Sequence, residues 1–170
     1  VAWFPGPEGA GWVRFVEKGF RAAIADSSAR VVAVKHGDTG REEQVLLIEE
    51  VFDEVDHIDY LVGSGPMAEA AVSILRSRGR EGIGVISDYM THAVHRGIRR
   101  GRIIAAPSDF PVMQGRLAVE MAVRAIEGTL VVRHAGPRIV TVTGENIGEY
   151  DAANTLAPAD FAPVFSAAPP

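Results

Sequence analysis

The feature of this sequence that most constrains its fold is an alternation of short Val- and Ile-rich runs with longer segments of helical periodicity. Helical stripes of apolar residues are expected within residues 13–24, 45–55, 68–75, 91–100 and 112–127. The short runs read as nearly continuous apolar stretches, which is typical of strands buried on both faces of a sheet. The expected strands are Val1–Phe4, Arg30–Lys35, Asp59–Val62, Ile83–Ile86, Arg102–Ala106 and Arg138–Thr143.

This order of elements predicts an α/β fold with three α-β-α layers around a mostly parallel, doubly wound sheet. Ligands of such folds bind where the carboxyl ends of the strands meet. The loops expected at that edge are Pro5–Trp12, His36–Gly40, Gly63–Met67, Ser87–His92 and Pro107–Pro111. The six candidate ligand-binding residues come from these loops: Gly11, Trp12, Asp38, Ser64, Tyr89 and Asp109.

The opening loop raises the question of a nucleotide site. Its glycines follow the order G-x-x-G-x-G, whereas a dinucleotide loop needs G-x-G-x-x-G, and the Lys-Ser or Lys-Thr pair of a phosphate-binding Walker loop is absent. Pro5 and Pro7 also remove two amide donors. Asp38 lies where a ribose-binding acid would be expected, so a dinucleotide site stays open as an alternative. A tight turn without ligand is another.

Two aromatic residues at the same edge suggest a different ligand. Trp12 stands at the start of a helix and Tyr89 follows the fourth strand, and aromatic faces attract cations and methylated ammonium groups. The two rings are therefore predicted to form part of an apolar cage. The alternatives are that Trp12 packs against its own helix and that Tyr89 is a partly buried edge residue. Trp3, inside a strand, is expected in the core.

Two acidic residues have both a structural and a binding interpretation. Asp38 or Thr39 is expected to cap the helix that follows, and an exposed Asp38 would also be able to touch ligand. Asp109 lies between two prolines where a strand leaves the sheet, which is typical of a hinge with Asp109 facing a cleft. The alternative is that Asp109 caps the helix at residues 112–127.

Composition and spacing exclude several kinds of chemistry. The chain has no cysteine, and His92 and His95 lack an evident third metal ligand, so no metal and no cofactor are expected. No nucleophile elbow is present, and we expect no enzyme. The net charge of −5 argues against nucleic acid, and the basic run Arg96–Arg102 is interpreted as a solvated helix end. No stretch approaches the ~20 apolar residues of a membrane span.

Five segments together resemble a known family: Phe4–Trp12, Gly37–Gly40, Asp59–Ser64, His95–Gly101 and Asp109–Arg116. They are similar to the second half of a type I periplasmic binding protein, and more closely to the TorT type, over roughly Val1 to Phe165. The resemblance implies two lobes with ligand between them. Residues 1–108 would form the second lobe, 109–137 a hinge and crossing helix of the first lobe, and 138–170 the final strand and tail. The first lobe itself is expected to lie outside this sequence. Either the chain is a fragment of a longer protein, or another chain supplies that lobe.

The resemblance also implies a function. TorT-type proteins are periplasmic sensors of trimethylamine N-oxide that act on the periplasmic domain of a sensor histidine kinase in a two-component system. A small methylated amine is therefore the expected ligand, in the periplasm and without membrane insertion. Two alternatives remain: the effector-binding half of a LacI-type regulator, and a dinucleotide-dependent enzyme. The Ala- and Pro-rich tail, residues 158–170, is expected to be loose at its end.

Overall fold

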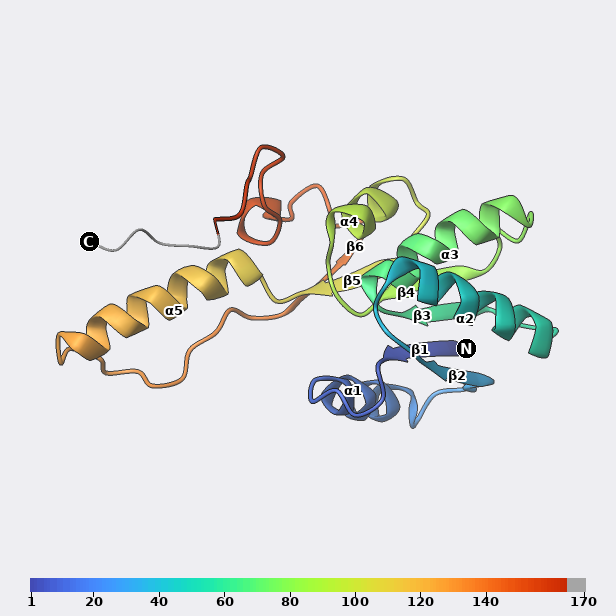
Figure 1. Ribbon diagram of the computed structural model, residues 1–170, viewed down its shortest axis with the longest axis horizontal. Coiled ribbons are helices and arrows are strands. Elements are labelled where there is room, and N and C mark those ends of the chain that lie inside the picture. Colours follow the sequence, from blue (N-terminus) through green and yellow to red (C-terminus); the bar gives the residue numbers. More distant parts are fainter. Residues whose placement is uncertain (165–170) are drawn as a thin grey trace. The chain divides into compact units, whose positions relative to one another are not determined.

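The computed structural model describes residues 1–164, which divide into two compact units (Figure 1). The first unit contains Val1–Ser108 and Val140–Tyr150, and the second contains Asp109–Ile139 and the residues from Asp151 on. Residues 165–170, which hold the end of the tail predicted to be loose, lie outside the described residues. The assignment of residues 109–137 to another lobe stays a prediction.

A six-stranded sheet forms the first unit, in the order β2-β1-β3-β4-β5-β6 (Figure 1). Strands β1 to β5 are parallel, and β6 runs antiparallel to β5. The predicted mostly parallel α/β sheet is thus confirmed. The strands are β1 (Ala2–Gly6), β2 (Ala33–His36), β3 (Tyr60–Gly63), β4 (Gly84–Ser87), β5 (Ala105–Ser108) and β6 (Val140–Thr143).

The strands reach further along the chain than their apolar runs predicted. The first five strands end one or two residues later than expected, at a Gly, Ser or His. These residues belong to the strands through their backbone, and because they are not strongly apolar they do not extend the apolar run in the sequence. The prediction that β5 stops at Ala106, before Pro107, was wrong. Pro107 is tolerated because β4 pairs with β5 only through Ile86 and Ala105, so the missing amide breaks no ladder bond to β4.

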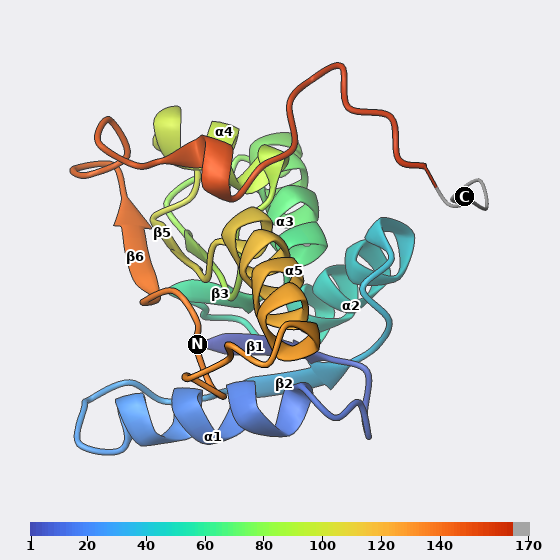
Figure 2. The ribbon, with the colours of Figure 1, turned by 90° about the vertical axis from the view of Figure 1, so that its left-hand side faces the viewer.

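Four helices flank this sheet: α1 (Val13–Ile24), α2 (Arg41–Glu54), α3 (Gly65–Ser77) and α4 (His92–Arg99). The connection from β1 to β2 runs in one direction across the sheet and the later connections run in the other. Because parallel crossovers are right-handed, α1 covers one face and α2, α3 and α4 cover the opposite face (Figure 2). Helix α3 packs between α2 and α4.

The core is densest beneath α3 and around β1. Helix α3 begins at Ser64, whose Oγ accepts a hydrogen bond from the Met67 amide at 3.2 Å. Gly63 lies so close to β1 that an added Cβ would stand 2.5 Å from the Phe4 carbonyl oxygen. On the other face, Trp3 is 1% exposed and stacks on Phe20 of α1 with ring centroids 4.5 Å apart. The prediction that Trp3 belongs to the core is confirmed.

The prediction that all strands are buried on both faces was wrong. Only β1 is buried along its whole length, while β3, β4 and β5 alternate between buried and partly exposed residues. The reason is that three helices cover one face of this unit, whereas α1 covers the other mainly beside β1. Tyr60 and Ile104, which border Gly84 on the less covered face, are 44% and 47% exposed.

The second unit is built around helix α5 (Pro111–Ile126) and a short 3-10 turn, η1 (Ala152–Asn154). Arg116 of α5 donates a hydrogen bond to the Asn154 side chain at 3.4 Å. No residue of α5 is buried, and its Val119, Val123 and Ile126 are 65%, 43% and 88% exposed. An apolar stripe on this helix is therefore left without cover within the second unit.

Candidate functional site

The loops that follow β1, β3 and β4 meet at the carboxyl edge of the sheet, because these three strands are neighbours and parallel. They contribute the opening loop up to Trp12, Ser64 at the start of α3, and the segment from Asp88 to Thr91. This edge of the first unit is the candidate site.

Trp12 folds back over the end of β1. A Cβ added at Gly6 would lie 2.6 Å from the Trp12 Cη2 atom, so the indole rests directly on this glycine. Gly6 has a φ of +105°, which also favours glycine there. The Trp12 side chain nevertheless stays 41% exposed, and it therefore offers part of its ring at the edge while the other part is held in place.

The opening loop is a pair of turns rather than an open cradle of amides. The Ala10 amide donates to the Pro7 carbonyl at 3.2 Å, and the Val13 amide donates to the Ala10 carbonyl at 3.1 Å. Gly11 is exposed, with open space where a Cβ would stand. A phosphate needs free amides that converge. The two turns use the amides of Ala10 and Val13, and Pro5 and Pro7 have no amide to donate. Few free amides are left for a phosphate, which weakens the dinucleotide alternative.

Tyr89 lies against the start of α3. A Cβ added at Gly65 would meet the Tyr89 ring at 2.9 Å and Thr91 Cγ2 at 2.6 Å. Burial and the nearby Asp88 carboxyl raise the pKa of the half-buried Tyr89, while hydrogen bonds with the Gly65 backbone and the Ser64 side chain oppose the increase. The fold thus brings Ser64 and Tyr89 together, although Ser64 itself is buried and serves α3 as its N-cap.

Asp88 is the functional candidate that the sequence interpretation missed. Its two carboxyl oxygens are buried and have no hydrogen-bond partner within residues 1–164. Burial raises the pKa of Asp88 to about 7, against a smaller lowering by its own backbone amide. A buried carboxyl without a partner is rare in a protein, and this makes Asp88 a candidate for a ligand-binding group. The signal available in the sequence was an acid directly after the apolar run Ile83–Ile86 and Ser87.

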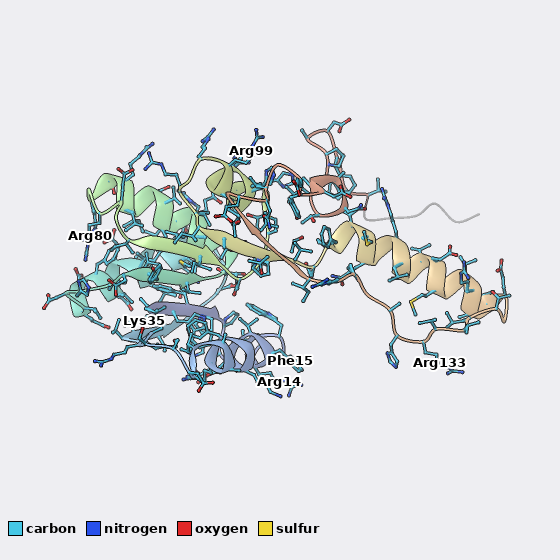
Figure 3. The ribbon with its side chains drawn as sticks, turned by 180° about the vertical axis from the view of Figure 1, so that it is seen from behind. Arg14, Phe15, Lys35, Arg80, Arg99 and Arg133 are labelled. Atoms are coloured by element: carbon cyan, nitrogen blue, oxygen red, sulfur yellow. The ribbon has the colours of Figure 1, made fainter. Side chains whose placement is uncertain are left out.

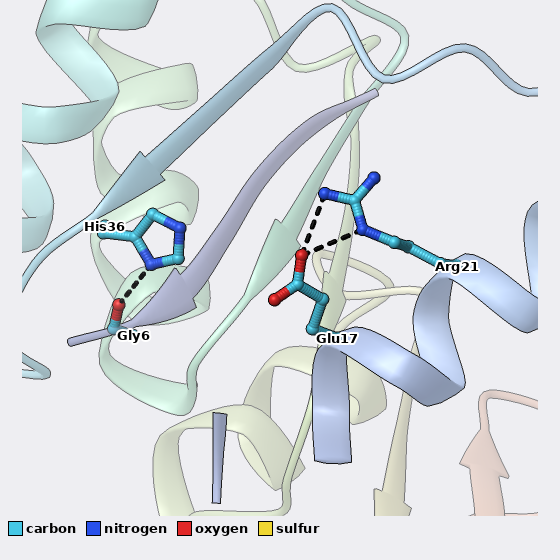
Figure 4. Close-up of polar contacts among 4 residues, drawn as sticks. All are labelled: Gly6, Glu17, Arg21 and His36. Carbon is cyan, nitrogen blue, oxygen red and sulfur yellow. Dashed lines mark hydrogen bonds and ion pairs between the residues drawn. The ribbon is translucent and has the colours of Figure 1, made fainter. Parts of the chain in front are cut away.

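Asp38 does not cap α2, and neither does Thr39. The N-cap is Gly40, which makes no side-chain bond, because Asp38 Oδ1 instead accepts a hydrogen bond from the adjacent Thr39 amide at 2.6 Å. Asp38 is exposed in the loop after β2. This loop is tied to the opening loop, since His36 Nδ1 lies 3.3 Å from the Gly6 carbonyl oxygen, a distance at which the Nδ1–H form donates (Figure 4).

Asp109 does not cap α5 either. The N-cap is Phe110, in the left-handed region with a φ of +54°, and Asp109 accepts hydrogen bonds from Gln114 through its carbonyl at 2.7 Å and its carboxylate at 2.9 Å. Asp109 begins the second unit, so the ligand role of Asp109 stays a prediction.

Hollows of about 190 to 550 Å³ in the described part of the chain are lined by residues other than Trp12, Ser64, Asp88 and Tyr89. Within residues 1–164, no group of three or more His, Cys, Asp or Glu is arranged to hold a metal ion. No helix in the described part of the chain is long and apolar enough to cross a bilayer.

Comparison with known proteins gives a clear relative. No protein-family profile matches the chain. Over 165 residues, 97% of the chain, it is 39% identical to the periplasmic protein TorT of Escherichia coli strain K12, and the same holds for TorT of strain O157:H7. The chain is a TorT-like periplasmic binding protein. It spans about half the length of these curated relatives, 48% in each case.

Solved structures place the TorT-like chain as one lobe of the type I fold. An ABC transporter solute-binding protein from Bradyrhizobium sp. BTAi1 with bound Bis-Tris is 46% identical, with a TM-score of 0.89 over 97% of this chain and 50% of that one. The complex of the TorS sensor domain with TorT in the presence of trimethylamine N-oxide is 34% identical, with a TM-score of 0.87 over 97% and 54%. These relatives are solute-binding proteins, in agreement with the prediction of no enzyme, and TorT is named as periplasmic, as predicted here.

Proposed function

We propose that this chain forms part of a periplasmic sensor that binds a small methylated amine, with trimethylamine N-oxide first, and that signals to a membrane histidine kinase. The observation that carries the proposal is Asp88, a buried carboxyl without a partner at the carboxyl edge of the sheet. The relation to TorT, whose complex with the TorS sensor domain exists in the presence of trimethylamine N-oxide, supports this choice of ligand and partner.

The chemistry of the N-oxide suits a carboxyl that holds a proton near neutral pH. The ligand carries one negatively polarised oxygen, which accepts hydrogen bonds and has no N–H or O–H to donate. A protonated Asp88 supplies the donor, and its pKa of about 7 keeps a large share of it protonated at pH 7. A carboxyl with an ordinary pKa would be ionised at this pH and would repel the oxide.

The methyl groups of the ligand need an apolar and electron-rich wall. Trp12 offers a partly exposed indole held over Gly6, and Tyr89 offers a ring packed on Gly65. Aromatic faces attract methylated ammonium groups by about 0.5–2 kcal/mol each. In this proposal Ser64 and Gly11 shape the surroundings of the site, and Asp38 borders it.

The remaining walls belong to the rest of the protein in this proposal. The candidate residues line none of the hollows at α3, α4 and the amino ends of the strands, and a ligand site that is not enclosed binds a small molecule weakly because water competes for its polar groups. A second lobe that closes over ligand would enclose the site, and the closed form is the state that the kinase would read.

The test is calorimetric titration of the full-length protein with trimethylamine N-oxide, with glycine betaine, choline and NAD as comparators. Trp12→Ala should weaken binding of the N-oxide by about tenfold, the loss expected for one aromatic wall. Phe15→Ala is the matched control, because Phe15 is a 65% exposed aromatic residue on α1 that lies under Arg14 rather than at the proposed cage. Unchanged affinity in Trp12→Ala would contradict the cage.

The pH dependence tests the role of Asp88 separately. Binding of the N-oxide should weaken as pH rises through about 7, because the donor proton is lost there. Asp88→Asn keeps an N–H donor at all pH values, so its binding should become independent of pH. The opposite slope, with tighter binding above pH 7 and loss of binding in Asp88→Asn, would mean that the ionised carboxylate binds a cationic amine.

A second candidate function is solute capture for a transporter. The Bradyrhizobium protein with bound Bis-Tris, an amine with several hydroxyl groups, is an ABC transporter component and is 46% identical. For that ligand class the ionised Asp88 would accept hydrogen bonds and bind the ammonium group. Bis-Tris in the same titrations distinguishes the two functions: binding of Bis-Tris without binding of the N-oxide would favour solute capture, and the reverse would favour the sensor.

A further inference from the structure

The charge of this chain is unevenly distributed. Residues 76–102 contain seven arginines and two acidic residues, whereas the chain as a whole carries 22 acidic and 17 basic residues. The arginines belong to the ends of α3 and α4 and to the loops that follow these helices. The result is a strongly basic segment on an acidic protein, and two of its arginines, Arg80 and Arg99, are labelled in Figure 3.

Four of these arginines line one groove between α3 and α4. The groove has a volume of about 360 Å³. Its apolar and small lining includes Val72 and Gly97, and Gly97 is required because a Cβ there would stand 2.5 Å from Ile103 Cδ1. Its charged lining consists of Arg76, Arg96, Arg100 and Arg102, with the acidic residues Glu69 and Glu81.

Three of the four arginines form no ion pair in the described part of the chain. Arg102 pairs with Glu81, but no acid of residues 1–164 lies within ion-pair distance of Arg76, Arg96 or Arg100. Cations at the end of a helix offset its dipole. That effect does not require this cluster, since α2 ends without any basic residue in its last turn. Uncompensated arginines around a concave surface are instead typical of a surface that receives carboxylates.

We propose that this groove, lined by Arg76, Arg96 and Arg100, is a docking site for an acidic segment of a partner protein. The proposal does not depend on the identity of the solute, because α3 and α4 run against the strands and their last turns point away from the carboxyl edge. A partner protein fits better than a lipid surface, since a flat bilayer does not enter a groove, whereas a side chain with a carboxylate does. Carboxylates form bidentate pairs with the planar guanidinium groups.

The experiment measures binding of a short fluorescein-labelled oligoglutamate peptide to the full-length protein by fluorescence anisotropy. Replacing Arg76, Arg96 and Arg100 together by Gln should raise the Kd about tenfold, as expected for three exposed charge pairs. Binding should also weaken as salt is added. An oligolysine peptide of the same length should not bind.

The matched control is a second triple substitution by Gln, at Arg41, Arg133 and Arg138, which removes the same charge from exposed residues outside the groove. It should change the Kd less than about twofold, because only the long-range field is altered. Thermal unfolding and far-UV circular dichroism of both variants establish that each is folded. Equal loss in the two triple variants, or no binding of the peptide to the unaltered protein, would overturn the proposal.

Two further probes assign the groove to another ligand if the inference is wrong. The first probe is a set of vesicles that contain phosphatidylglycerol. Retention of the protein on these vesicles, lost in the groove variant while the peptide fails to bind, would make the surface a membrane contact. Inorganic phosphate that binds the groove more tightly than the peptide would make it a site for a small anion. Either result overturns the docking of an acidic protein segment.

Discussion

Replacement of Asp88 by Asn should stabilise the protein at alkaline pH and leave its stability almost unchanged in acid. The pKa of this carboxyl is about 7 in the folded chain, against 3.8 for an ordinary Asp. At 1.36 kcal/mol per pKa unit, this difference corresponds to about 4 kcal/mol. The folded state therefore holds a proton that the unfolded state has already released between about pH 4 and pH 7.

The sign follows from this excess of protons in the folded state. As pH rises from about 4 to about 7, the free energy of unfolding falls, and above pH 7 the full penalty is present. Asn cannot ionise and escapes the penalty. Between pH 5 and pH 8, the stability of Asp88→Asn relative to the unaltered protein should therefore rise by about 2 to 3 kcal/mol, since the penalty grows only until pH 7.

Urea unfolding at pH 5 and pH 8, followed by far-UV circular dichroism, measures this difference. Asp53→Asn, at an exposed position of α2, is the matched control and should show the same small effect at both pH values. A relative stability of Asp88→Asn that is equal at the two pH values, or that falls at pH 8, would refute the reasoning from burial. The predicted result would mean that the fold tolerates an unfavourable carboxyl, as is typical of ligand sites.

Two other predictions concern packing. Gly6→Ala should destabilise the chain by about 1–3 kcal/mol and increase acrylamide quenching of Trp12. Gly9 has a φ of +83° but open space around it, so Gly9→Ala should show the backbone strain without the change in quenching. Equal quenching in both variants would contradict the contact between the indole and Gly6. Val119→Asp combined with Val123→Asp should lower the melting temperature of the full-length protein if another lobe covers α5, and unchanged melting would contradict that assignment.

Local patterns in the sequence were sufficient for the elements and for the sheet. Apolar runs and helical stripes depend on neighbours in the chain, so the six strands and the five helices could be predicted with ends correct to within a few residues. The glycines that end α3 and α5, Gly79 and Gly128, have positive φ values of +64° and +70°, which is a local signal that the sequence carries. The helix N-caps were harder to predict from the sequence, because Asp38 and Asp109 each had several possible hydrogen-bond partners. They accept hydrogen bonds from Thr39 and Gln114 and do not cap α2 and α5.

What the sequence determined by itself is the α/β class and that the residues of the loops after β1, β3 and β4 reach the carboxyl edge of the sheet, since alternation of strands and helices brings the carboxyl ends of parallel strands together. Only the tertiary structure decided which of those residues differ from ordinary surface residues in their contacts and burial. The contact of Trp12 with Gly6 and the burial of Asp88 depend on strands that are distant in sequence. Burial and the loss of water are properties of the packed chain, and for this reason the carboxyl with the most altered pKa was not visible in the pattern of letters.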